Sequence, residues 1–143
     1  MIPALATDSS LGTVELKIPS KAEWVAVARL AIAAVASRLR FSVDEIEDIK
    51  LATAEACTNC IQHGSDADQI EITAEATASE LRLTVRDRGV SRKLESVDQG
   101  AGFTDDRVDE LGVFLIRALM DDVEYHVHAG EGTELIMIKR VSD

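Results

Sequence analysis

Positive charge is scarce in this chain of 143 residues, which carries 15 Lys and Arg against 26 Asp and Glu and has a formal net charge of −11. A surface of this sign repels the phosphates of nucleic acids and of anionic lipids. Direct binding to nucleic acid or to a membrane surface is therefore not expected. The same charge suits a basic protein partner, although acidity also serves solubility alone.

Long apolar runs are also missing. The longest apolar stretch extends from Trp24 to Val35, and Arg29 interrupts it. A helix needs about 20 apolar residues to cross a bilayer, so this stretch is too short. The N-terminus has no basic region ahead of an apolar one, which is the pattern of a secretory signal. We expect a cytosolic protein.

Cysteine is limited to Cys57 and Cys60, which fits a reducing compartment. Their C-x-x-C spacing, with His63 three residues further on, is compatible with a metal site or a redox pair. Three ligands at this spacing turn around the surface of one helix, and no second Cys or His cluster exists to complete a tetrahedral site. We therefore interpret the two cysteines as small core residues.

Alternation of apolar and polar residues predicts the strands. The first strand begins at Val14, where order is also expected to begin, and stops at Pro19. The remaining strands are expected near residues 70–76, 81–85, 123–127 and 135–138.

Capping-box patterns predict the first two helices. Ser20 is followed three residues later by Glu23, and Ser42 is followed in the same way by Glu45. The predicted helices cover about residues 20–39, 42–63 and 107–120.

The order β-α-α-β-β-loop-α-β-β predicts an α/β fold, a two-layer sandwich with the helices packed on one face of a mixed, mainly antiparallel sheet. A content of 46% hydrophobic and 29% charged residues is enough for one core. We expect a flexible tail over residues 1–12 and one domain over residues 13–143. The polar loop from Asp87 to Asp106 is long for so small a domain, which favours a functional lid.

One face of the second helix carries Asp48, Glu55, Asn59 and Gln62. The opposite side, which periodicity predicts to face the core, carries Val43, Ile46, Ile49, Thr53, Cys57, Cys60 and Ile61. A plain solvated face would produce the same pattern. However, Glu55 and Asn59 have small neighbours, as polar groups at the edge of a pocket do. A carboxylate and an amide one turn apart can accept a proton and offer an oxygen to Mg²⁺.

The run from Glu55 to His63 resembles the N box of the anti-sigma-factor serine kinases, a branch of the GHKL superfamily of ATPases and kinases with the Bergerat ATP-binding fold. Residues 44–50 and Arg29 match the same branch, and the resemblance spans Val14 to Arg140. It implies that Glu55 is the general base or orienter for the attacking hydroxyl. It also implies that Asn59 holds the Mg²⁺ that bridges the phosphates of ATP.

The same resemblance assigns the remaining site residues. Asp87 and Gly89 match the motif that receives adenine, Gly112 matches a glycine that presents backbone N–H groups to phosphate, and Thr133 matches a threonine near adenine. By itself, each of these residues would also fit a turn or a close packing contact. Arg29 is assigned to the partner-binding surface, with a solvated arginine as the alternative.

Two positions depart from the family pattern. Ser91 and Glu110 stand where the second and third motifs usually have glycine. A carboxylate near a triphosphate repels it. Glu110 thus motivates an alternative function, a partner-switching binding module with weak or lost nucleotide binding.

The function that the resemblance implies is that of a bacterial anti-sigma factor with serine-protein kinase activity. Such a protein binds ATP and Mg²⁺ and phosphorylates a serine of an anti-anti-sigma partner with a STAS domain. It holds a sigma factor when that partner is unavailable, and it is commonly a homodimer. A histidine-kinase fragment is disfavoured because the chain has no room for a phosphoacceptor helical hairpin, and the length does not fit a gyrase-like ATPase.

Overall fold

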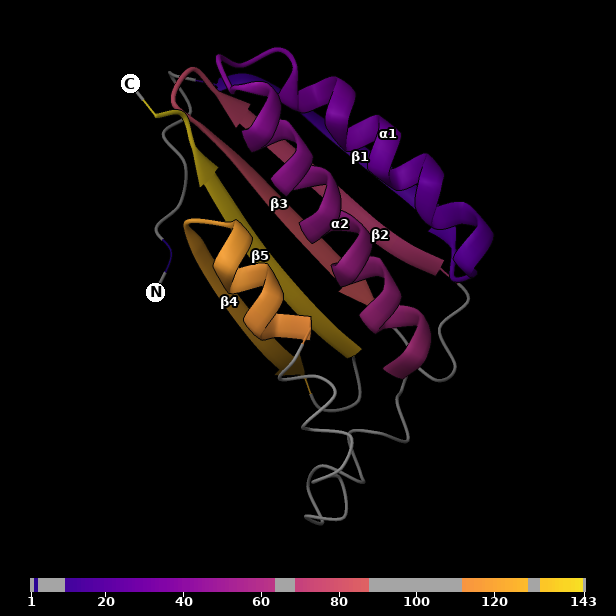
Figure 1. Cartoon of the computed structure of the whole chain (residues 1–143). Helices are drawn as coiled ribbons and strands as arrows, with labels where there is room; N and C mark the ends of the chain where they lie inside the picture. The colour runs from indigo at the N-terminus through magenta and orange to yellow at the C-terminus, as the bar shows by residue number, and fades with distance from the viewer. Residues whose placement is uncertain (1, 3–9, 64–68, 88–111, 129–131, 143) are drawn as a thin grey trace.

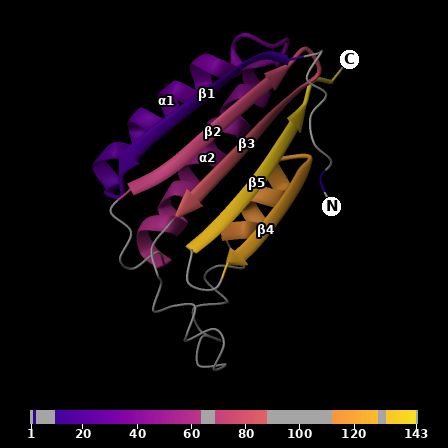
Figure 2. The ribbon, with the colours of Figure 1, turned by 180° about the vertical axis from the view of Figure 1, so that it is seen from behind.

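The computed structural model describes residues 2, 10–63, 69–87, 112–128 and 132–142. Helices cover one face of a five-stranded sheet whose strand order is β1-β2-β3-β5-β4 (Figures 1 and 2). The elements are β1 (Ser10–Pro19), the 3-10 turn η2 (Ala22–Trp24), α1 (Val25–Ala36), α2 (Val43–His63), β2 (Gln69–Thr77), β3 (Glu80–Asp87), β4 (Asp122–His128) and β5 (Gly132–Arg140). Residues 112–119 are also helical.

The two-layer sandwich agrees with the fold predicted from the sequence, with one correction to the sheet. All four strand pairings among the described residues are antiparallel. The sequence predicted a mixed sheet with some parallel pairing, and the described strands have none. The crossover that places β5 between β3 and β4 brings residues far apart in sequence to the same end of the sheet.

The core lies between the sheet and the helices. On β2, Ile70, Ile72 and Ala74 are buried and alternate with partly exposed residues, as a strand with one covered face requires. From the helical layer, Ile32 of α1 and Ile49 of α2 are fully buried against this face.

The second capping box forms as predicted. The Ser42 hydroxyl accepts a hydrogen bond from the backbone N–H of Glu45 at 3.0 Å, and the Glu45 carboxylate accepts one from the backbone N–H of Ser42 at 2.7 Å. These bonds satisfy donors that the first turn of a helix leaves without partners. The second helix therefore begins where the sequence indicates.

The first capping box does not form. The backbone at Lys21 is extended, and the backbone N–H of Trp24 bonds the carbonyl of Lys21 at 2.9 Å, which makes the tight turn η2. The helix α1 begins only at Val25 and ends at Ala36, so it is shorter than predicted. A local hydrogen bond of the backbone thus takes the place of the predicted side-chain cap.

Two further predictions change. The first strand starts at Ser10, earlier than Val14, because backbone pairing with β2 continues as far as Thr77. Val43, which periodicity places on the core side of α2, is 77% exposed because it begins the first turn of the helix. None of the helices described is long and apolar enough to cross a membrane.

Candidate nucleotide site

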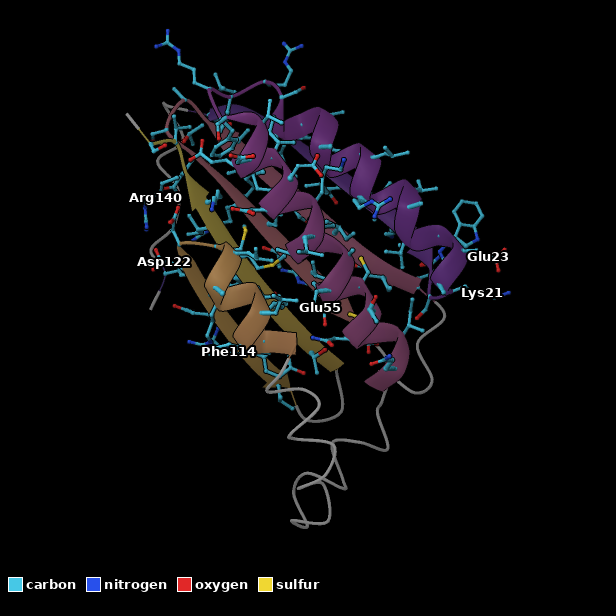
Figure 3. All side chains as sticks on the ribbon, in the orientation of Figure 1. Lys21, Glu23, Glu55, Phe114, Asp122 and Arg140 are labelled. Carbon is cyan, nitrogen blue, oxygen red and sulfur yellow. The ribbon has the colours of Figure 1, made fainter. Side chains whose placement is uncertain are left out.

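The second helix carries the predicted catalytic residues along the edge of its buried face. Ala52 and Ala56 are buried, whereas Glu55 and Asn59 are only partly exposed. Periodicity predicted that these two polar residues lie on the side opposite to the core. The structure instead places them beside the core. Figure 3 labels Glu55 on the stretch of α2 that lies beside the helix of residues 112–119.

Asn59 and Gly112 meet although they are far apart in the sequence. A Cβ atom built on Gly112 would lie 2.7 Å from Nδ2 and 2.8 Å from Oδ1 of Asn59. A Cβ at these distances would clash with the Asn59 amide as it stands, so the helix of residues 112–119 comes this close to α2 because residue 112 is glycine. The predicted Mg²⁺ ligand and the predicted phosphate-binding glycine are therefore neighbours.

Asp87 and Thr133 lie at the same end of the sheet. They are direct partners in the antiparallel pairing of β3 with β5, so their side chains share one face of the sheet. This is the face toward the helices, because Asp87 continues the alternation of the buried residues Leu83 and Val85. Asp87 is itself only 2% exposed.

Asp87 is also linked electrostatically to α2. Burial raises the pKa of the Cys60 thiol well above its usual value, and the Asp87 carboxylate raises it further. Because Cys60 directly follows Asn59 in the sequence, Asp87 is placed near the same end of α2. A buried carboxylate accepts strong hydrogen bonds from amino groups.

The two cysteines behave as core residues. Both are buried and free, and burial raises the pKa of Cys57 to about 12. A thiol held in its protonated form is a poor metal ligand and a poor nucleophile. No group of three or more His, Cys, Asp or Glu within the described ranges is arranged to hold a metal ion.

Other predicted residues lie apart from this cluster or beyond what the structure describes. Arg29 is exposed on α1. Gly89 lies outside the described residues, as do Ser91, Glu110 and nearly all of the predicted lid from Asp87 to Asp106.

Comparison with known proteins identifies the family. The model of the histidine kinase-like ATPase domain matches residues 18–139. The serine-protein kinase RsbW of Bacillus thuringiensis (strain Al Hakam) is 39% identical over 137 residues, and that of Bacillus cereus (strain B4264) is 41% identical over 137 residues. Each alignment covers 90% of this chain and 84% of the relative. The chain belongs to the anti-sigma-factor serine kinase family.

A solved structure gives the same fold for this kinase. The crystal structure of the RsbU and RsbW domains of Rv1364c from Mycobacterium tuberculosis superimposes with a TM-score of 0.70 at 18% identity. The superposition covers 92% of the kinase and 33% of the larger chain.

The sequence analysis did not single out Lys139 of β5, which contacts both the helix of residues 112–119 and α2. The Lys139 side chain is 12% exposed, and its Nζ donates a hydrogen bond to the backbone carbonyl of Leu119 at 2.6 Å. A signal was present, because the alternation of Leu135 and Met137 on the buried face continues to residue 139. A lysine at an inward position requires a specific partner.

Proposed function

We propose that this kinase transfers the γ-phosphoryl group of ATP to a serine hydroxyl of an anti-anti-sigma protein with a STAS domain. When that partner is unavailable, it sequesters a sigma factor in the bacterial cytosol. The observation that carries the proposal is the convergence of Asn59, Asp87, Gly112 and Thr133 from α2, β3, the helix of residues 112–119 and β5. The names of the relatives support the reaction class.

Asn59 and Gly112 hold the phosphate end of the nucleotide in this proposal. The amide oxygen of Asn59 is a suitable ligand for Mg²⁺, which prefers oxygen donors shared with phosphates. Gly112 is the first described residue of its helix, and backbone N–H groups near it bind the phosphate in this proposal, as the resemblance to the family implies. Because Gly112 has no side chain, its backbone lies directly against the Asn59 amide.

Asp87, Gly89 and Thr133 hold the adenine end. A carboxylate that is 2% exposed can accept a hydrogen bond from the adenine amino group with little competition from water. Thr133 stands beside it in the neighbouring strand. ATP bound with Mg²⁺ supplies the phosphoryl group, and the protein supplies position and charge.

Glu55 orients the attacking group. It lies one turn before Asn59 on α2, so a serine hydroxyl directed at the phosphate end comes within its reach. The carboxylate accepts the proton of that hydroxyl as the new bond to phosphorus forms.

The exposed side of α1 is the proposed partner surface. Arg29 is exposed there, next to Leu30, which is 63% exposed. Val27 of α1 and Trp24, at the end of η2 directly before α1, extend this apolar surface. A cation within exposed apolar residues is a favourable contact for another protein, which fits binding of the sigma factor, of the STAS protein or of a second copy of the chain.

Phosphoryl transfer with ATP labelled on the γ-phosphate tests the proposal. A STAS-domain protein and a sigma factor from the same cell serve as partners. Transfer to a serine is expected, and Glu55→Gln should lower its rate by about 10²–10⁴ while sigma binding is retained. Glu47→Gln, an exposed carboxylate on the same helix, is the matched control. Sigma binding without any transfer by the parent protein would instead establish the non-catalytic binding module that Glu110 motivates.

A further inference from the structure

Lys139 joins three elements at a partly buried point away from the proposed nucleotide site. Its Nζ donates to the carbonyl of Leu119 and lies 3.6 Å from a carboxylate oxygen of Asp48 on α2. The last carbonyls of a helix have no partner within the helix and carry partial negative charge, so a cation there stabilises the end of the helix. Lys139 thus ties the C-terminal end of the helix of residues 112–119 to β5 and to α2.

The other end of this helix rests on Asn59. The helix of residues 112–119 runs antiparallel to α2 (Figure 1), with Gly112 on Asn59 and Leu119 toward Asp48. Asp48, Glu55 and Asn59 are seven and four residues apart, close to two turns and one turn, so they lie on one stripe of α2. Both ends of the described part of this helix, residues 112 and 119, are therefore placed against the stripe that carries Glu55.

The contacts of this helix decide where it lies. Ile116, in its middle, is fully buried and holds the helix on the core. Leu119 packs against the same core, and Met120, directly after the helix, is buried. Apolar contacts have no fixed direction, whereas a hydrogen bond with a charged donor at the end of the helix restricts both sliding and rotation.

We propose that Lys139 is a positioning residue for phosphoryl transfer. It holds the helix of residues 112–119 in the register that places Gly112 on Asn59, and it thereby sets the phosphate end of the nucleotide site from the opposite end of the helix. Lys139 touches neither ATP nor the serine substrate. The proposal rests on the proposed kinase function for its effect on catalysis, whereas its effect on Asn59 exists in the protein without nucleotide.

The test compares Lys139→Met, which keeps the apolar stem and removes the charged donor, with Lys50→Met as the matched control. Lys50 pairs with Glu47 at 3.0 Å on α2 and has no hydrogen bond to the helix of residues 112–119. In the nucleotide-free protein, NMR follows the side-chain amide of Asn59, and hydrogen exchange follows residues 112–119. Steady-state transfer assays then give KM for ATP and kcat.

Lys139→Met should shift the Asn59 side-chain resonance, speed exchange of the helix by about tenfold and raise KM for ATP by about tenfold, with a much smaller change in kcat. Lys50→Met should leave all of these unchanged. Asp48→Asn, which keeps the bond from Lys139 to Leu119, should give the same changes at smaller size. If Lys139→Met does not fold, the same measurements are made on Asp48→Asn and on Lys139→Arg.

An unchanged Asn59 resonance and unchanged exchange in Lys139→Met would overturn the proposal. A lower melting temperature with unchanged KM would do the same, because it would reduce Lys139 to a stabilising residue. If the parent protein binds no ATP, the kinase proposal fails by itself, and the NMR and exchange measurements still decide whether Lys139 positions Asn59.

Discussion

Gly112→Ala perturbs the closest contact in the proposed site. The added Cβ would lie 2.7 Å from Asn59 Nδ2, whereas ordinary contact begins at 3.4 Å, so the Asn59 amide or the helix of residues 112–119 must move by about 0.7 Å. The nearest atoms belong to a side-chain amide, which moves more easily than backbone. We therefore expect Asn59 to turn away, which takes its oxygen out of position for Mg²⁺.

Stability and nucleotide affinity should respond differently to this substitution. Overpacking costs about 1–3 kcal/mol, and the better helix propensity of alanine offsets about 0.8–1 kcal/mol of it. The net loss of about 0–2 kcal/mol leaves the protein folded. Displacing a metal ligand by most of 1 Å, in contrast, can lower phosphoryl transfer by about 10²-fold.

Calorimetry with ATP and Mg²⁺, transfer assays and thermal unfolding measure the three effects. Gly12→Ala is the control, since its Cβ would meet nothing within 4 Å but its φ of +151° is strained for alanine. It should lose stability and keep nucleotide affinity. If Gly112→Ala binds ATP and transfers phosphate as the parent does, the contact between Gly112 and Asn59 does not control the site.

Other predictions address the rest of the molecule. Asp87→Asn should weaken ATP binding by about 1.5–3 kcal/mol in calorimetry, because it removes a charge-assisted hydrogen bond; equal affinities would remove Asp87 from the adenine site. Arg29→Glu should weaken binding of the sigma factor or the STAS protein in a pull-down, and unchanged binding of both would mean a merely solvated arginine. Burial raises the pKa of Cys57 from 9.0 to about 12. The stabilising contribution of the protonated thiol is therefore complete below pH 9 and is lost as the pH rises toward 12. In denaturant titrations over this pH range, the parent should lose stability more steeply than Cys57→Ala. Glu110→Gly should tighten ATP binding by about tenfold, more than ADP binding and less at high salt, and equal affinities would show that Glu110 points away from the phosphates.

Local patterns predicted most of the fold. The alternation in residues 70–76 and the reciprocal bonds of Ser42 and Glu45 depend on atoms only a few residues apart, and the structure has both. The same kind of reasoning was wrong at Ser20 and Glu23, where a tight backbone turn competes with the capping box. Neighbouring residues alone do not decide between two local hydrogen-bond patterns of similar energy.

The sequence by itself determined the helices and strands, the burial of Cys57 and Cys60, and the motif on α2 that indicates a kinase. The tertiary structure alone decided which residues meet. The closeness of Gly112 to Asn59, the pairing of Asp87 with Thr133 and the bond from Lys139 to Leu119 each join separate elements. Periodicity states which face of an element is buried, but the strand order and the packing of the helices on the sheet determine what lies opposite that face.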